Sequence, residues 1–206
     1  MNNRFNDLFT MKKPDEELIL LCAERNESAF NELYGRYKDK LFSFICQYVE
    51  NRHTGEDIFQ ETFFRIVKHA GRFNKKKKFS SWIYTIAANL CRDELKRRKR
   101  RIKEVSLEKK IKYRPQEDSG VELKENIRAK GKSPREELEA GELTDRMAEA
   151  VARLPVLYRI PLELNVREEL KYREVAQVLK LPLGTVKSRI HKAVQMLRKD
   201  MEKYGS

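Results

Sequence analysis

The fold is decided by the stretch Lys171-Tyr-Arg-Glu-Val-Ala-Gln-Val-Leu-Lys-Leu-Pro-Leu-Gly-Thr-Val-Lys-Ser-Arg-Ile-His-Lys-Ala-Val-Gln-Met-Leu-Arg198. Apolar residues recur at helical spacing on both sides of residues 181–184, whose Pro and Gly are typical of a tight turn. The inward positions are Val175, Ala176 and Leu179 before the turn, and Val186, Ile190, Val194 and Leu197 after it. Thr185 is placed to cap the second helix. The stretch therefore predicts a helix, a tight turn and a second helix.

The outward face of this second helix carries hydrogen-bond donors near its N-terminal end. They are Lys187, Ser188, Arg189, His191 and Lys192. This end of a recognition helix meets base edges in the major groove, where Arg and Lys suit guanine and Ser suits a phosphate or a base edge. An ordinary helical hairpin with a solvated charged face is the alternative. The coincidence of turn, cap and basic face favours DNA recognition.

The rest of the chain also shows helical periodicity. Only eight Gly and six Pro occur, and strict alternation of apolar and polar residues is absent. Helices are expected to begin at Asp15, Ser28, Thr54, Phe79, Ser133 and Pro155. The third of these should end at Gly71, and the fourth should end in the basic run of residues 96–101. The pattern predicts an all-α fold.

Residues 102–132 lack an apolar stripe and are rich in Lys and Glu, so we interpret them as a flexible linker. A chain of 206 residues suits two small domains better than one large one. The expected division is an N-terminal extension at 1–14, a helical bundle at 15–101, the linker at 102–132 and a helix-turn-helix domain at 133–206.

The chain is strongly basic, with 45 Lys and Arg against 32 Asp and Glu and a formal net charge of +13. This balance favours a polyanionic partner over a merely solvated charged surface. No apolar run approaches the roughly 20 residues that span a bilayer, and the N-terminus lacks a signal-peptide pattern. The three cysteines form no CxxC pair, so we interpret them as small core residues in a reducing cytoplasm, without a disulfide or a zinc site.

Aromatic and basic residues meet in the fourth expected helix. Trp82, Tyr84 and Asn89 precede its basic end, and four lysines at residues 75–78 precede its start. Aromatic faces beside a cationic groove stack unpaired bases and neutralise their backbone. A core Trp is the alternative for Trp82 alone, but the lysine loop makes nucleic-acid contact the better interpretation.

The start of the third expected helix is acidic, in contrast to the basic fourth helix. It carries Glu56, Asp57 and Glu61 together with Gln60. Carboxylates near a helix N-terminus also favour the helix dipole, which requires no partner. A metal-dependent nuclease is a weaker alternative, because no histidine or general base is suitably placed. A protein-contact face is the better functional interpretation.

Five segments, in order, resemble the extracytoplasmic-function (ECF) sigma factors, the smallest members of the sigma-70 family. They are Ala29-Phe-Asn-Glu-Leu-Tyr-Gly-Arg-Tyr37, Gly55-Glu-Asp-Ile-Phe-Gln-Glu-Thr-Phe63, Phe79-Ser-Ser-Trp-Ile-Tyr-Thr-Ile-Ala-Ala-Asn89, Leu154-Pro-Val-Leu-Tyr-Arg159 and Leu183-Gly-Thr-Val-Lys-Ser-Arg-Ile190. The match covers residues 15–101, the family's region 2, and residues 141–204, its region 4. It implies a protein that binds core RNA polymerase and directs promoter-specific initiation, while the polymerase makes the RNA.

The resemblance also implies roles for individual residues. The residues that it implies dock on the clamp helices of the polymerase's largest subunit are Asp57, Gln60, Glu61 and Phe63. Contact with the −10 element falls to Lys77, Lys78, Phe79, Ser80, Trp82, Tyr84, Asn89, Arg97 and Arg98, with Asn89 capturing a flipped base. Contact with the −35 element falls to Thr185, Lys187, Ser188, Arg189, His191 and Lys192.

Two residues depart from the family pattern. Lys171 stands where a Ser or Thr cap is usual, and Pro161 falls inside a helix that it should kink. Neither departure removes a residue expected to face DNA.

We therefore expect two helical domains, region 2 and a region 4 helix-turn-helix, in a protein that is not an enzyme and needs no cofactor or metal. The expected partners are the core polymerase, through its clamp helices and flap, promoter DNA and an anti-sigma factor, without membrane insertion. The expected location is the cytoplasm, with the nucleoid when in holoenzyme. A free-standing helix-turn-helix regulator is the main rival, but it leaves the segment at residues 55–63 unexplained.

Overall fold

The computed structural model describes residues 13–49, 51–110 and 146–202, with the backbone alone from residue 103 to 110. Most of the expected N-terminal extension, residues 111–132 of the expected linker and the expected helix start at Ser133 lie outside the described residues.

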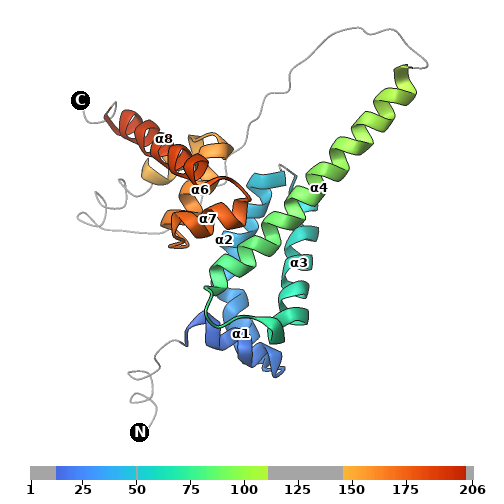
Figure 1. Ribbon diagram of the computed structural model, residues 1–206, viewed down its shortest axis with the longest axis vertical. Coiled ribbons are helices and arrows are strands. Elements are labelled where there is room, and N and C mark those ends of the chain that lie inside the picture. Colours follow the sequence, from blue (N-terminus) through green and yellow to red (C-terminus); the bar gives the residue numbers. More distant parts are fainter. Residues whose placement is uncertain (1–12, 50, 111–145, 203–206) are drawn as a thin grey trace.

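Every element of the described residues is helical, which confirms the all-α prediction (Figure 1). In chain order they are α1 (Asp15–Ala23), α2 (Glu27–Val49), α3 (Arg52–His69), the short 3-10 helix η1 (Ala70–Arg72), α4 (Phe79–Lys110), a helical stretch at 146–153, α6 (Val156–Val166), α7 (Tyr172–Leu179) and α8 (Leu183–Glu202).

The helix N-termini differ from the expected ones by up to three residues. Asn51, not Thr54, caps α3, because its Oδ1 accepts a hydrogen bond from the Thr54 N–H at 2.9 Å. Asn26 Oδ1 similarly accepts from the Ala29 N–H at 3.0 Å at the start of α2. Thr185 lies inside the first turn of α8 and is not its cap. In both asparagine caps the amide oxygen satisfies a backbone N–H that has no partner within the helix.

Helix α4 does not end at the basic run, where its end was expected, but continues to Lys110, into the first residues of the expected linker. Lys, Arg and Glu have long, unbranched side chains that lose little freedom in a helix, and Arg97 forms an ion pair with Glu94 one turn earlier. A charge-rich composition therefore does not by itself end a helix.

The two departures from the family pattern are accommodated locally. Pro161 is buried within α6, which is helical on both sides of it. The side chain of Lys171 makes no capping bond, but its backbone N–H donates to Glu174 Oε2 at 2.7 Å. That bond supplies one half of a capping box at the start of α7.

The first bundle consists of α1 to α4, with α2 packed against the other three helices. The inward stripe of α2 is formed by the buried residues Leu33, Tyr37, Leu41, Phe44 and Ile45. Helix α1 also anchors its neighbours. Asp15 Oδ2 accepts from the Tyr37 hydroxyl at 2.5 Å, and Glu16 Oε1 accepts from the Phe79 N–H at 2.8 Å, which caps α4 from outside the helix.

Gly55 allows α3 to cross close to α2. A Cβ atom at this position would lie 2.8 Å from Cys46 Sγ, well inside van der Waals contact. We expect Gly55→Ala to lower the free energy of unfolding by about 1–3 kcal/mol, as overpacking does elsewhere. Cys46→Ala should restore part of this loss in the double variant, because it removes the obstructing sulfur. Urea denaturation of both single variants and the double variant checks this, and an equal loss with and without Cys46 would contradict it.

The second bundle consists of residues 146–153, α6, α7 and α8. Val175 and Val178 of α7 and Val186 and Ile190 of α8 are buried between the helices. Lys180, in the turn between them, has a left-handed backbone conformation with φ 53°. The predicted helix, turn and helix are thus all present.

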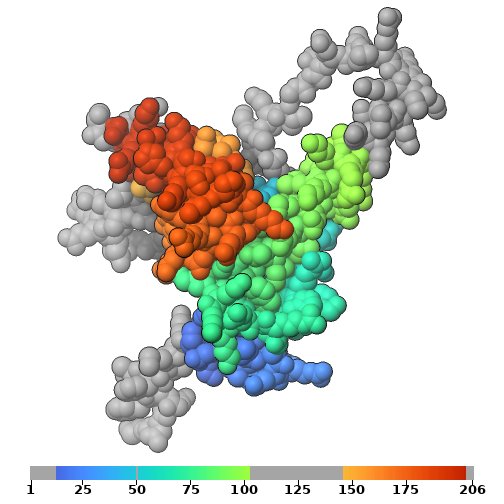
Figure 2. Space-filling model, in the orientation of Figure 1, coloured from blue at the N-terminus to red at the C-terminus, as the bar shows by residue number. Residues whose placement is uncertain are grey.

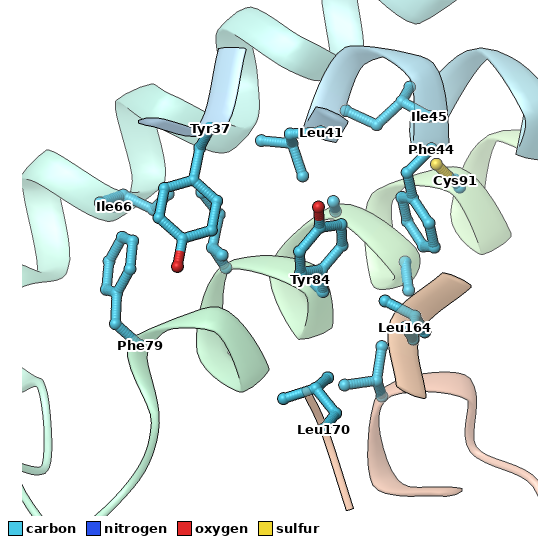
Figure 3. Packing of buried hydrophobic residues seen from close by; sticks show 14 of the residues in the cluster. Tyr37, Leu41, Phe44, Ile45, Ile66, Phe79, Tyr84, Cys91, Leu164 and Leu170 are labelled. Atoms are coloured by element: carbon cyan, nitrogen blue, oxygen red, sulfur yellow. The ribbon is translucent and has the colours of Figure 1, made fainter. Parts of the chain in front are cut away.

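The two bundles pack against each other. Helix α7 lies against α4, and α6 contacts α2 (Figure 1). Tyr84 of α4 packs against Phe44 of α2 with ring centroids 5.0 Å apart, and the second bundle's Leu164 and Leu170 lie on the same side of α4 (Figure 3). The buried cluster is therefore continuous from one bundle into the other, which the sequence did not predict.

The cysteines are small core residues, as expected. All three are free, with Cys22 and Cys91 buried and Cys46 half-buried. Burial raises the pKa of the Cys91 thiol to about 12, so this thiol stays protonated at neutral pH.

Candidate functional site

The outward face of α8 presents the residues expected to read DNA. Lys187, Ser188, His191 and Lys192 are exposed, and Arg189 is half-buried. The Ser188 hydroxyl donates to the Thr185 carbonyl oxygen at 3.0 Å, which leaves the Ser188 oxygen free to accept. Thr185 is itself half-buried and acts here through its backbone. The face therefore combines cations with one fixed hydroxyl at the exposed start of a helix.

A hollow of about 390 Å³ lies between α3, η1 and α4. It is lined by Arg65, His69, Arg72, Trp82, Ile86 and Asn89. The structure thus brings Trp82 and Asn89 together, as expected, and adds three basic residues from α3 and η1 that the sequence analysis missed. An aromatic ring, an amide and several cations around one open hollow suit an unstacked nucleotide.

Two residues of the hollow are held firmly. Trp82 packs on Phe73 and Phe79, with ring centroids 5.3 and 6.1 Å apart. Asn89 Oδ1 accepts from Arg92 Nη2 at 2.5 Å, which leaves the second lone pair of this oxygen and the amide N–H groups available. The amide is thereby oriented by a residue of its own helix.

Three residues expected to contact the −10 element are instead core residues. Phe79 and Tyr84 have exposed fractions of 0% and 2%, and Ser80 is also buried. Phe79 packs against Tyr37 with ring centroids 5.2 Å apart, and burial raises the pKa of the Tyr84 hydroxyl. The Phe79 and Tyr84 side chains support the surface from below, whereas Ser80 lines a hollow beside the lysine loop. Contact of these three residues with the −10 element stays a prediction.

The lysine loop before α4 is exposed at residues 75–78. Asn74 shapes it: Asn74 Oδ1 accepts from the Lys76 N–H, and its carbonyl oxygen accepts from the Lys77 N–H, both at 2.9 Å. Lys78 Nζ donates to the carbonyl oxygen of Glu169 at 2.9 Å. Farther along α4, Arg97 and Arg98 are exposed, as expected. The loop and the far end of α4 therefore carry exposed cations in addition to those that line the hollow.

The acidic face of α3 is only partly free. Asp57 and Gln60 are exposed, whereas the Glu61 carboxylate accepts from Arg65 Nε at 2.6 Å. Glu56 is likewise paired, with Arg52 at 3.2 Å. The free part of this face is therefore small and centred on Asp57 and Gln60.

Phe63 is not on this face, contrary to expectation. It is 7% exposed and packs against Tyr34 and Phe59, with ring centroids 5.1 and 5.0 Å apart. The next residue, Phe64, is 61% exposed and follows Gln60 by one turn. The buried series Ile58, Thr62 and Ile66 could have assigned the inward register and hence the outward position of Phe64.

Among residues 13–49, 51–110 and 146–202, no group of three or more His, Cys, Asp and Glu residues is placed to hold a metal ion. Within the same ranges, no helix is both long and apolar enough to cross a membrane.

Comparisons with known proteins agree on one family. The model of sigma-70 region 2 matches residues 33–101, and the model of sigma-70 region 4 matches residues 144–197. The chain is 31% identical over 176 residues to the ECF RNA polymerase sigma factor SigW of Bacillus subtilis, covering 85% of this chain and 90% of that protein. It is 26% identical to the RNA polymerase sigma-H factor of Pseudomonas aeruginosa, covering 93% and 95%.

Solved structures show the same fold. The sigma factor RpoE of Bartonella quintana, determined with the anti-sigma factor NepR, aligns with a TM-score of 0.58 and 17% identity, covering 84% of this chain and 96% of that one. CnrH, determined with the cytosolic domain of CnrY, aligns with a TM-score of 0.53 and 19% identity, covering 93% and 99%.

Proposed function

The chain belongs to the ECF sigma factors of the sigma-70 family, RNA polymerase subunits that direct transcription, and from this premise we propose that three separate exposed surfaces divide its work. The exposed face of α3 binds core polymerase, the hollow between α3 and α4 captures the −10 element, and α8 reads the −35 element. Sigma factors are not enzymes, so the chemistry of RNA synthesis remains with the polymerase.

Core binding is assigned to Asp57, Gln60 and Phe64. Their spacing of three and four residues places them along one exposed stripe of α3. A carboxylate, an amide and an exposed ring offer an acidic and apolar contact on an otherwise basic protein. Glu61 lies beside the stripe and is paired with Arg65, which lines the hollow.

The −10 assignment rests on the single observation that carries the proposal, namely that Trp82 and Asn89 line one open hollow with Arg65, His69 and Arg72. A flipped base needs a ring to stack on and an amide to read its edge, while its phosphates need cations. Lys75, Lys76 and Lys77 extend this positive surface along the adjacent loop.

An anti-sigma partner is also proposed. One solved structure with this fold is the sigma factor RpoE bound to the anti-sigma factor NepR, and another is CnrH bound to the cytosolic domain of CnrY.

Base-reading and phosphate-binding residues of α8 should respond differently to mutation. Arg189→Ala is expected to weaken promoter binding by about 1–3 kcal/mol and to relax preference at one position of the −35 element. Lys192→Ala should weaken binding to all promoter sequences alike. It should also reduce the slope of log affinity against log salt concentration by about one unit.

Binding of both variants in holoenzyme to a panel of single-base promoter mutants, at several salt concentrations, tests this proposal. The matched control is Lys199→Ala, a late exposed lysine of the same helix. A panel in which no variant shows a position-specific effect would remove −35 reading from α8.

A further inference from the structure

Asn89 is held by a neighbour that fixes the direction of its amide. Asn89 Oδ1 accepts from Arg92 Nη2 at 2.5 Å, one turn along α4. A guanidinium carries N–H donors and no acceptor, whereas an amide has an oxygen on one branch and an NH2 group on the other. The oxygen must therefore face Arg92, because the reversed amide would set N–H groups against N–H groups.

Arg92 acts from outside the hollow between α3 and α4. Asn89 is among the residues that line this hollow and Arg92 is not, so the amide oxygen is turned to a group outside it. Within residues 13–49, 51–110 and 146–202, the Asn89 NH2 group has no hydrogen-bond acceptor. The second lone pair of the oxygen stays beside the guanidinium, whose positive charge repels an approaching amino group. The NH2 group is therefore what Asn89 offers to a ligand.

The Arg92 guanidinium is itself held at a second point. Its Nη1 donates to the Val178 carbonyl oxygen at 3.1 Å, where α7 packs on α4. Figure 2 shows the orange surface of α7 against the green surface of α4. The bond to Asn89 nevertheless lies within α4, at a spacing of three residues, so it does not require α7.

The other polar groups that line the hollow are mostly donors as well. Arg65 and Arg72 carry N–H groups, and the Trp82 indole can only donate. His69 can accept through one ring nitrogen when it is neutral. Together with the Asn89 NH2 group, these side chains make a hollow in which donors predominate.

The four bases differ in what they present to such donors. Guanine has a keto oxygen where adenine has an amino group, and thymine has a keto oxygen where cytosine has an amino group. A keto oxygen satisfies a donor, whereas an amino group leaves that donor unpaired, which is costly away from water. A donor-rich hollow therefore discriminates between keto and amino bases.

We infer that Arg92 is a positioning residue that makes the hollow select a keto base, guanine or thymine, over the amino base of the same ring size. This inference rests on the proposed capture of a −10 base by Asn89. Arg92 exerts the selection through the Asn89 amide, by keeping its oxygen turned away and its NH2 group turned to the base.

The test uses holoenzyme, assembled from the full chain and purified core polymerase, on templates pre-melted across the −10 element of a mapped promoter. Pre-melting removes the cost of unpairing, which would otherwise differ among the bases. Abasic sites placed one at a time in the non-template strand locate the captured base. There the unaltered protein loses affinity and Asn89→Ala loses nothing further. All four bases are then compared at that position by competition anisotropy.

The unaltered protein should bind guanine about tenfold more tightly than adenine, or thymine more tightly than cytosine by a similar factor. Arg92→Lys keeps a donor beside Asn89 and should keep most of this preference. Arg92→Gln can donate or accept and should lose it. Arg92→Glu places an acceptor there, so the amide should reverse and the preference should turn to the amino base.

The ratio between bases is the decisive quantity, because loss of a positive charge or of the bond to Val178 lowers all four affinities alike. Lys96→Glu is the matched control: it makes the same charge change on an exposed residue one turn farther along α4. It should weaken binding to every base and leave the ratio unchanged. Circular dichroism establishes that each variant is folded.

Two kinds of failure are distinguishable. A position that depends on Asn89 but shows no keto preference, or a keto preference that persists in Arg92→Glu, would overturn the inference and leave base capture in place. If no abasic position depends on Asn89, base capture by this residue fails and the inference fails with it.

Discussion

Replacing Asp57 and Gln60 together by alanine should weaken binding to core polymerase by roughly 30-fold or more, corresponding to the 2 kcal/mol or more of an interface hot spot. Both side chains are exposed on α3, so the fold should be unaffected. Fluorescence anisotropy with purified core enzyme measures the affinity. Asp39→Ala, an exposed carboxylate of α2, is the charge-matched control. Unchanged affinity in the folded double variant would remove core binding from this face.

The adjacent pair of phenylalanines sharpens this test. Phe64→Ala should lower core affinity and leave stability nearly unchanged, because the ring is mostly exposed. Phe63→Ala should cost about 3–5 kcal/mol of unfolding free energy, as truncation of a buried ring does. A large loss of stability in Phe64→Ala, with a loss of core affinity alone in Phe63→Ala, would contradict the register of α3.

Asn89→Ala should slow open-complex formation on duplex promoter DNA by roughly 10- to 100-fold, within the 1–3 kcal/mol that a paired base contact supplies. The defect should be smaller on a template with a pre-melted bubble, where the cost of extruding the base is already met. Permanganate footprinting over time on both templates measures it, with Asn31→Ala of α2 as the amide-matched control. Equal losses on duplex and bubble templates would indicate that Asn89 is structural.

The helix-turn-helix could be predicted in detail because one apolar stripe on each side of a Pro and Gly turn has few alternatives. Single residues within a matched motif were less certain. The resemblance marked the segment from Phe79 to Asn89, but only packing shows that Phe79 and Tyr84 face the core while Trp82 and Asn89 line the hollow. Family likeness identifies a surface, and burial decides which side chains belong to it.

The missed residues share one cause. Arg65, His69 and Arg72 belong to α3 and η1, and they approach Asn89 only because α3 packs beside α4. The ion pair of Lys40 with Glu168 joins residues 128 positions apart. No local periodicity predicts such a pair, since it depends on how two complete bundles meet.

The helix ends were hard to predict for a different reason. Asn51 and Thr54 can both act as caps, and the choice between them depends on a few tenths of a kcal/mol. The length of α4 was underestimated because Lys, Arg and Glu favour helices and linkers alike.

Run-off transcription with purified core polymerase tests the central claim most directly. Addition of this protein to core enzyme, on fragments that carry promoters mapped after its overexpression, should yield discrete transcripts from those promoters and no others. The Asp57→Ala, Gln60→Ala double variant should abolish them in the same assay. Core enzyme that gives the same transcripts with and without the protein would contradict the account.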